Sequence, residues 1–427
     1  MATAAAVFLA LIIAAPAASA NKRDIVVWVP KGFKPAASAA LPASVDGHRV
    51  RILVRDMSNL QQRLLSGNPR NAPDVVFIDA SRTGELASAA LITPIELDRG
   101  TRRTLTKAAV DGFRFGFNIY GVPMQTQNVA MVTNADLVPQ APNTFRQLRR
   151  VALQLQRQDR VSIPLALGQD PESPAAEALY PLFAGLGGFI FGTNAGGSLD
   201  PTKVGIDNAA FRKNSGQIDT WNTTGLVNSS ITTKQAREAF LEGRSPFWIA
   251  APTDIEALTK VTFRYRISAV PRIVKGQRTS PLMRSHGFAV TTFARQRNVL
   301  APARALVTQV APGARAQRAF AGGSPLVGLP ANRNAAANVS NRQLVAFGAA
   351  AGGAVPYPNI AQWGLASTAW VEAWRASTRG ANAEPPATPA AQAFATARTV
   401  VRQGAAAGRS LQAGVGDLVS VGRVAGL

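Results

Sequence analysis

Four adjacent hydrogen-bonding side chains interrupt an otherwise apolar stretch at residues 125–128, Gln-Thr-Gln-Asn. Their amides and hydroxyl can both donate and accept hydrogen bonds, as a polar ligand requires. The run over 128–133 is apolar and partly β-branched, as a buried strand would be. We therefore predict a strand that crosses between two lobes and turns Gln125 and Gln127 toward a cleft. The alternative is an ordinary strand with a polar edge.

The residue types that carry most enzyme chemistry are scarce. The chain has no cysteine and only two histidines, His48 and His286, so neither thiolate chemistry nor a multi-histidine metal site is expected. Its 24 acidic residues among 427 form no recognisable carboxylate pair of the kind that a glycosidase needs. We therefore expect no catalysis through a thiol, through histidines or through a carboxylate pair, and neither a metal nor a cofactor. A carbohydrate hydrolase is the enzymatic alternative.

The elements that must position such a site alternate between strand and helix. Apolar strands are predicted at 24–29, 50–54 and 74–78, and Ser58 or Asn59 can cap a helix before the third strand. This order favours a parallel sheet with helices on its faces, an α/β fold. Ligands of such sheets bind beyond the carboxyl ends of the strands. The length of 427 residues predicts two lobes rather than one core.

The second half of the chain supplies elements for another lobe. Thr144 is predicted to cap a helix over 145–157, where apolar residues recur at helical spacing. Further elements are predicted as strands at 163–167, 246–250 and 261–270, and as closing helices within 331–374 and 387–403.

Several separated motifs resemble one known family. They are Tyr120-Gly-Val-Pro, Asn134-x-Asp-Leu-Val-Pro, Val204–Ala209, Ala239–Gly243 and Pro358-Asn-Ile. Over residues 24–400 the chain resembles the extracellular solute-binding proteins of ABC sugar importers, family 1, and most of all the maltose/maltodextrin-binding group. The resemblance implies a two-lobed, periplasmic-binding-protein-like α/β fold of type II, with a mixed sheet flanked by helices in each lobe. It places three hinge crossings, at 118–139, 287–292 and 326–330.

The resemblance also implies sugar-binding residues in the first lobe. Lys31 stands where the family sends a lysine to sugar hydroxyls, and Arg82 matches a sugar-binding arginine. Ser81 replaces an aspartate, and Gln127 replaces a glutamate, which keeps hydrogen bonding but loses the charge. Ile78 stands where the family has an aromatic platform. The alternatives are that Lys31 and Arg82 are surface cations and that Gln127 is a structural hinge residue.

In the second lobe the resemblance implies four more ligand contacts. Asp170 follows a strand end and can accept from sugar hydroxyls, and Thr253 stands where the family has a stacking tryptophan. Asp254 is either a ligand contact or the cap of the following helix. Trp363 is the ring expected to stack on the sugar. Two further tryptophans of that segment are expected in the core: Trp370 and Trp374.

The ends and the lobe limits follow from composition and from the resemblance. Residues 1–20 hold a short apolar run and a small-x-small end, which predicts a secretory signal peptide; a short buried helix is the alternative. The N-terminal lobe is expected to comprise 21–126 plus 286–330, and the C-terminal lobe 127–285 plus 331–403. Residues 404–427 are expected to form a loose tail. We therefore expect an exported protein, periplasmic or extracellular, with no cysteine for a lipid anchor.

The chain is strongly basic, with a formal net charge of +22. Such a charge favours anionic partners, but the basic residues are scattered in ones and twos rather than gathered in a run. We therefore do not expect nucleic-acid binding. A codon-composition bias would explain the excess of arginine over lysine. The expected function is capture of a maltodextrin-type or related sugar by a monomer that delivers it to an ABC permease. The alternative ligand is an acidic or phosphorylated solute.

Overall fold

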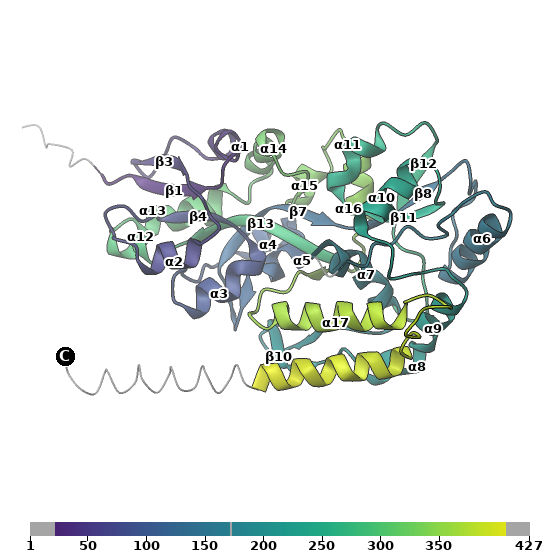
Figure 1. Cartoon of the computed structure of the whole chain (residues 1–427). Helices are drawn as coiled ribbons and strands as arrows, with labels where there is room; N and C mark the ends of the chain where they lie inside the picture. The colour runs from purple at the N-terminus through teal and green to yellow at the C-terminus, as the bar shows by residue number, and fades with distance from the viewer. Residues whose placement is uncertain (1–21, 171–172, 407–427) are drawn as a thin grey trace, which may run out of the picture.

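The computed structural model describes residues 22–170 and 173–406 (Figure 1). The predicted signal peptide and residues 407–427 of the predicted tail lie outside the described residues. Buried apolar side chains gather in one large cluster between Ile25 and Ala331 and in two clusters between Val129 and Val401. We call the parts built on them the N-terminal lobe, on the left in Figure 1, and the C-terminal lobe, on the right.

The N-terminal lobe is built on a mixed sheet of eight strands in the order β14-β7-β13-β4-β1-β3-β2, with β15 paired to β13. Strand β1 pairs in parallel with β3 and β4, as the sequence predicts, whereas β13 runs antiparallel to β4 and β7. The strands are β1 (Ile25–Val29), β2 (Ser44–Val45), β3 (His48–Val54), β4 (Val75–Asp79), β7 (Gly121–Asn128), β13 (Leu282–Val290), β14 (Leu329–Pro330) and β15 (Val355–Pro356).

Short helices cover this sheet, and phenylalanine side chains pack in the core of the lobe. Phe77, Phe288 and Phe320 pack with ring centroids 5.0–5.9 Å apart, and each ring is buried. The helical segments are α1 (Lys34–Ala40), α2 (Leu60–Leu65), η1 (Ala80–Arg82), α3 (Thr83–Ser88), α4 (Arg99–Thr104), α5 (Lys107–Gly112), α12 (Phe293–Gln296), α13 (Leu300–Ala305), η3 (Leu306–Val310), α14 (Ala314–Gly323) and α15 (Arg333–Ala336).

The C-terminal lobe has a smaller sheet, in which β8 (Ala130–Asn134) lies between β11 (Phe247–Ala250) and β12 (Tyr265–Ser268). Both pairs are antiparallel. Of the strand predicted at 163–167, only a single parallel bridge forms, between Ala166 and Trp248. The remaining strands form two antiparallel pairs: β5 (Arg114–Phe115) with β6 (Asn118–Ile119), and β9 (Phe191–Thr193) with β10 (Leu199–Val204).

Longer helices surround this second sheet. Thr144 caps α6 in a reciprocal capping box with Gln147, which confirms the predicted helix start. The helical segments are α6 (Phe145–Arg157), α7 (Ser173–Gly185), α8 (Ala209–Asn214), α9 (Gly216–Thr223), α10 (Thr233–Leu241), η2 (Pro252–Asp254), α11 (Ile255–Leu258), α16 (Arg342–Ala349), α17 (Trp363–Ser377) and a last described helix over 390–406.

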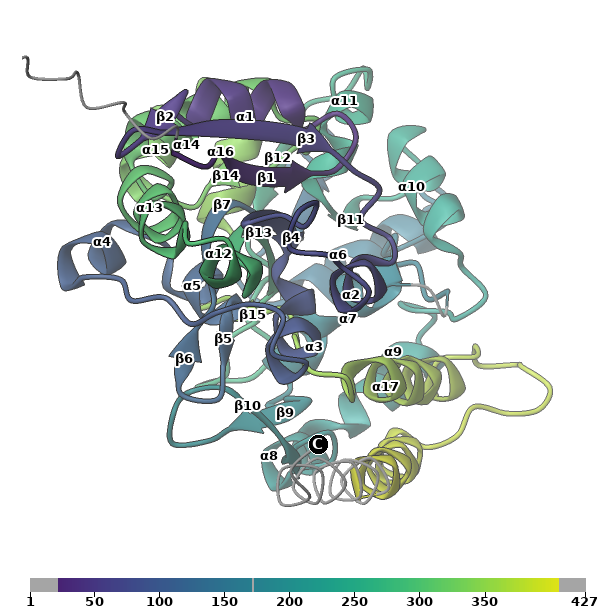
Figure 2. The ribbon, with the colours of Figure 1, turned by 90° about the vertical axis from the view of Figure 1, so that its left-hand side faces the viewer.

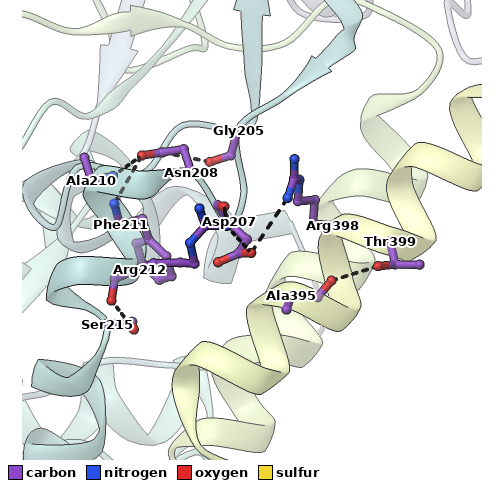
Figure 3. Close-up of polar contacts among 10 residues, drawn as sticks. All are labelled: Gly205, Asp207, Asn208, Ala210, Phe211, Arg212, Ser215, Ala395, Arg398 and Thr399. Atoms are coloured by element: carbon purple, nitrogen blue, oxygen red, sulfur yellow. Dashed lines mark hydrogen bonds and ion pairs between the residues drawn. The ribbon is translucent and has the colours of Figure 1, made fainter.

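An ion cluster and a ring anchor this last helix (Figure 3). The buried carboxylate of Asp207 lies 3.2 Å from the Arg212 guanidinium and 3.9 Å from that of Arg398 in the last helix. Phe394 packs against Phe211, with ring centroids 4.6 Å apart. Both ion pairs and ring packing thus hold this last described helix against the rest of the C-terminal lobe.

The chain passes between the lobes first at Val129, which separates β7 from β8. It returns through 269–281, between β12 and β13, and leaves again between α15 and α16. Residues 287–290, predicted within a crossing, lie inside the N-terminal sheet, where Gly287 pairs with Ile78. A buried strand and a crossing strand carry the same apolar pattern, so the sequence could not separate them.

Candidate functional site

One guanidinium joins the two lobes. Arg284, near the start of β13, places its Nη1 3.1 Å from the Asp79 carboxylate at the end of β4. Its Nε lies 2.6 Å from the Glu177 carboxylate on α7, in the other lobe. In Figure 1, β13 reaches across the middle of the molecule to α7. The three side chains keep 17–22% of their surface exposed, so solvent still reaches them.

Strand register gathers further polar side chains on the same face. Arg284 lies opposite Gln127, and His286 lies opposite both Gln125 and Asp79. Because directly paired residues point to the same face of a sheet, these five side chains share one face. His286 Nε2 lies 3.4 Å from Asp79 Oδ2. We call Asp79, Glu177, Arg284 and His286 the lobe-boundary cluster.

Burial and charge act against each other in this cluster. Burial raises the pKa of Glu177, and the nearby Arg284 offsets only part of that effect. Burial also opposes ionisation of Asp79, but His286, Arg284 and hydrogen bonds from Ser81 together lower its pKa. Burial lowers the pKa of His286, which keeps the imidazole neutral near pH 7. The cluster therefore holds two carboxylates against one fixed cation.

An aromatic pair lies beside the cluster. The Arg284 guanidinium stacks over the Tyr357 ring, 4.0 Å from its centroid. Tyr357 in turn packs edge-on against Trp363, with centroids 5.4 Å apart. Trp363, the predicted stacking ring, begins α17 and is 8% exposed. Trp370 and Trp374 are fully buried, in the core as predicted.

The predicted hinge amides hold a neighbouring loop. Gln125 is buried and donates to the carbonyls of Leu326 and Gly328, while its Oε1 accepts from Ser324. Gln127 donates to the carbonyl of Val327 at 2.7 Å. Both amides therefore fix the loop before β14 against the first crossing.

The other predicted residues of the N-terminal lobe lie around the strand ends. Ser81 donates its backbone N–H to Asp79, which places Ser81 next to the cluster. Arg82 pairs with Glu85 at 3.0 Å and donates to the Met57 carbonyl. Lys31 is exposed in the turn after β1. Of these, Ser81 contacts the cluster directly.

The predicted residues of the C-terminal lobe gather around α10. Asp170 accepts from the backbone N–H and the hydroxyl of Thr233, the first residue of that helix. Asp254 accepts from the Ala251 N–H and pairs with Arg237 of α10 at 3.1 Å. Burial raises the pKa of Asp254. Thr253, the residue before it, is exposed.

A cavity of about 950 Å³ lies beside the cluster, with Tyr357 in its wall, and also touches both lobes. Its walls come from α5, β10, α16 and β15, and include Tyr180, Phe191 and several alanines. The nine predicted ligand residues are not among those that line it. In Figure 2, α5, β15 and β10 lie to the left of α7, which carries Glu177 of the lobe-boundary cluster.

Sequence reasoning did not select the cluster residues, although each left a signal. Arg284 and His286 are charged or polar at alternate positions of an apolar run, which puts them on one face of a strand. Asp79 follows the predicted third strand directly, and Glu177 is the only charged residue in the apolar segment 173–185. Polar residues in such apolar surroundings are costly unless they are paired or functional.

The described residues form neither a metal site nor a membrane-spanning helix. Within residues 22–170 and 173–406, no group of three acidic, histidine or cysteine side chains is placed to hold a metal ion. Across that same part of the chain, no helix has the length and apolar character to cross a membrane.

Comparison with known proteins gives one family match. The family described as bacterial extracellular solute-binding protein matches residues 21–308. Three curated relatives are similar over much of their length. A galactooligosaccharide-binding protein of Bacillus subtilis (strain 168) is 22% identical over 306 residues, 68% of this chain and 71% of the relative. The maltodextrin-binding protein MdxE of the same organism is 24% identical over 312 residues, 68% of this chain and 72% of the relative.

The third relative is a maltooligosaccharide ABC transporter solute-binding lipoprotein of Streptococcus pneumoniae (strain ATCC BAA-255 / R6). It is 23% identical over 276 residues, 62% of this chain and 63% of the relative.

Proposed function

The chain belongs to the family of bacterial extracellular solute-binding proteins, and from that premise we propose that it captures an oligosaccharide between its two lobes and delivers it to an ABC permease. The names of these relatives state that they bind galactooligosaccharides or maltodextrin, or serve a maltooligosaccharide transporter. The family fold has two lobes, and its members are binding proteins that act outside the cytoplasm. The protein then performs no reaction, and ligand binding shifts the balance between open and closed lobes.

The observation that carries the proposal is the lobe-boundary cluster. Sugar hydroxyls are bound by planar groups with two donors or two acceptors, and Asp79, Arg284 and Glu177 are groups of that kind. They come from both lobes and remain partly exposed. Tyr357 and Trp363 add rings beside them. A ligand seated there would touch both lobes at once.

The charge of the cluster favours a neutral sugar over an acidic solute. Two carboxylates face one guanidinium, and Arg284 already pairs with both. An anionic ligand at this position would meet like charge at short range. Of the two cations predicted from the sequence, Arg82 is paired with Glu85, and Lys31 is exposed in the turn after β1.

The cavity of about 950 Å³ is the competing site. Large apolar pockets are the usual place for small ligands, but none of the nine sequence-predicted residues lines this one. Lys107 and Arg114 at its edge both pair with Asp111. We therefore place the sugar at the lobe-boundary cluster, together with the sequence-predicted residues: Lys31, Ser81, Arg82, Gln125, Gln127, Asp170, Thr253, Asp254 and Trp363.

The proposal includes the two lobes, with limits at the crossings at Val129, 269–281 and 337–341 in place of the expected 126, 285 and 330. It also includes export by a signal peptide and a monomeric state. Mass spectrometry of small molecules released from the purified protein, followed by titration of the best candidate, tests the function. We expect a neutral oligosaccharide whose affinity falls in Arg82→Ala and in Gln127→Ala. An acidic solute in the released fraction, or unchanged affinity in both variants, would contradict the proposal.

A further inference from the structure

The two carboxylates that meet at Arg284 belong to different lobes. Asp79 ends β4 of the N-terminal lobe, and Glu177 lies on α7 of the C-terminal lobe. Each lies within 3.1 Å of the same guanidinium. Two ionised carboxylates at this range repel each other strongly where water is partly excluded. The observed arrangement of the lobes therefore depends on the cation between them.

We propose that Arg284 is a positioning residue whose charge allows the lobes to close, because it compensates Asp79 and Glu177 as they approach each other. The inference rests on the proposed function only in that closure encloses a ligand. The compensation acts between groups of the protein, so it can be measured without a ligand. A planar guanidinium suits this task, since its separate donors can serve two carboxylates at once.

No second cation takes over this role in the described part of the chain. His286 lies 3.4 Å from Asp79, but burial lowers the pKa of its imidazole. Tyr357 lies under the guanidinium and contributes a ring face. Ser81 donates one backbone N–H to Asp79. Of the described lysines and arginines, only Arg284 forms an ion pair with Glu177.

Removal of Arg284 should therefore link closure to proton uptake. In the observed arrangement, burial already raises the pKa of Glu177. Without Arg284 this pKa would rise further, because Asp79 would then act on Glu177 without compensation. A protonated Glu177 carries no charge, so acidification should restore closure in a variant that lacks the arginine.

The chain offers a clean way to measure closure, because it has no cysteine. Gln62→Cys on α2 and Lys234→Cys on α10 place one exposed spin label on each lobe. Distance distributions between the labels are then recorded at pH 8 on the full protein freed of bound solute. We expect Arg284→Met to shift the distribution to longer distances. Arg284→Lys should give an intermediate shift, because a lysine keeps the charge but not the planar fork.

Two rescues distinguish this role from simple packing. The double variant Arg284→Met with Glu177→Gln should return to the wild-type distances, because the repulsion is removed. Acidification of Arg284→Met to pH 5 should do the same. Glu372→Gln serves as control, since it removes an acidic partner from a pair within α17, 2.9 Å from Arg375, that does not join the lobes.

Wild-type distances in Arg284→Met and in Arg284→Lys would overturn the inference. So would an open state that neither rescue reverses. If Arg284→Met alone does not fold, Arg284→Lys with and without Glu177→Gln decides the question. The readout needs no ligand, so failure here leaves the sugar proposal standing. Absence of sugar binding would leave this inference unchanged.

Discussion

Two aspartates stand at opposite ends of β4, and each faces an arginine. Asp74, just before the strand, is fully buried and accepts from the backbone of β1 at 2.7 Å. Its partner Arg297 lies 3.4 Å away and donates to two backbone carbonyls of the same lobe. Asp79, at the other end, keeps 21% of its side-chain surface exposed, and its partner Arg284 reaches a carboxylate of the second lobe.

The difference shows how similar ion pairs can serve two purposes. Arg297 has its donors on one lobe, so its pair with Asp74 fixes the start of the sheet. Arg284 shares its donors between lobes, so its pairs depend on the lobe arrangement. Solvent reaches Asp79 but not Asp74, and only groups that solvent can reach are able to exchange partners with a ligand.

The largest expected effect comes from breaking the internal pair. Arg297→Met leaves the Asp74 carboxylate buried without its cation, which should lower the free energy of unfolding by about 3–5 kcal/mol. Chemical unfolding measures this loss. Arg284→Met is the matched comparison and should cost less, because Asp79 and Glu177 regain water when the lobes separate. Equal losses in the two variants would mean that the pair within one lobe and the pairs between the lobes do not differ in their contribution to stability.

The second effect is a pH dependence of stability carried by Asp74. Burial raises the pKa of this carboxyl from its ordinary value of 3.8 to about 6. The folded pKa lies above the unfolded one, so this contribution is fully present below about pH 4 and is lost as pH rises through about 6. The loss is about 3 kcal/mol. In Asp74→Asn, the free energy of unfolding measured between pH 4 and 8 should not show this loss. The same pH dependence in the wild type and in Asp74→Asn would contradict the role of Asp74.

The third effect concerns ligand affinity at the lobe boundary. Glu177→Ala and Gln127→Ala each remove a hydrogen-bonding group from the cluster face, and each should weaken maltotriose binding by about tenfold, or 1.4 kcal/mol. Stability should change little, since both side chains are partly exposed. Calorimetric titration measures the affinity, with Glu372→Gln as the control that binds like wild type. Normal affinity in both variants would place the sugar elsewhere.

The smallest effect concerns a third carboxylate, Asp207. The exposure of its side chain lies between those of Asp74 and Asp79. Asp207 is buried but has two arginines, and Arg398 is the more distant, at 3.9 Å and partly exposed. Arg398→Ala should therefore lower the free energy of unfolding by no more than about 1 kcal/mol. Thermal unfolding checks this. A loss as large as that of Arg297→Met would mean that the last helix depends on charge rather than on Phe394.

Sequence patterns predicted the parts of the fold that depend on local order. The strand predicted at 24–29 is β1, the one at 74–78 is β4 shifted by one residue, and Thr144 caps α6. These features arise from apolar runs and caps within a few residues of each other. The resemblance supplied the two-lobed arrangement, which local patterns alone would not fix.

The lobe-boundary cluster could not be predicted in the same way. Asp79 and Arg284 are 205 residues apart, and they meet only because β13 pairs with β4 in one register. A register shifted by one residue would turn Arg284 to the other face. Glu177 reaches the cluster through the packing of α7 against β13, which sequence periodicity does not encode. Asp254, offered as a cap of the following helix, instead accepts from the N–H of Ala251, before η2, and makes no cap hydrogen bond to α11.

Calorimetric titration with a neutral oligosaccharide and its acidic counterpart tests the central claim most directly. Maltotriose, a galactooligosaccharide and a glucuronic-acid-bearing oligosaccharide are titrated into the wild type and into Asp79→Asn. We predict saturable binding of at least one neutral sugar, weaker binding in Asp79→Asn, and no binding of the acidic sugar. Binding of only the acidic sugar, or a neutral sugar bound equally by both proteins, would contradict the account.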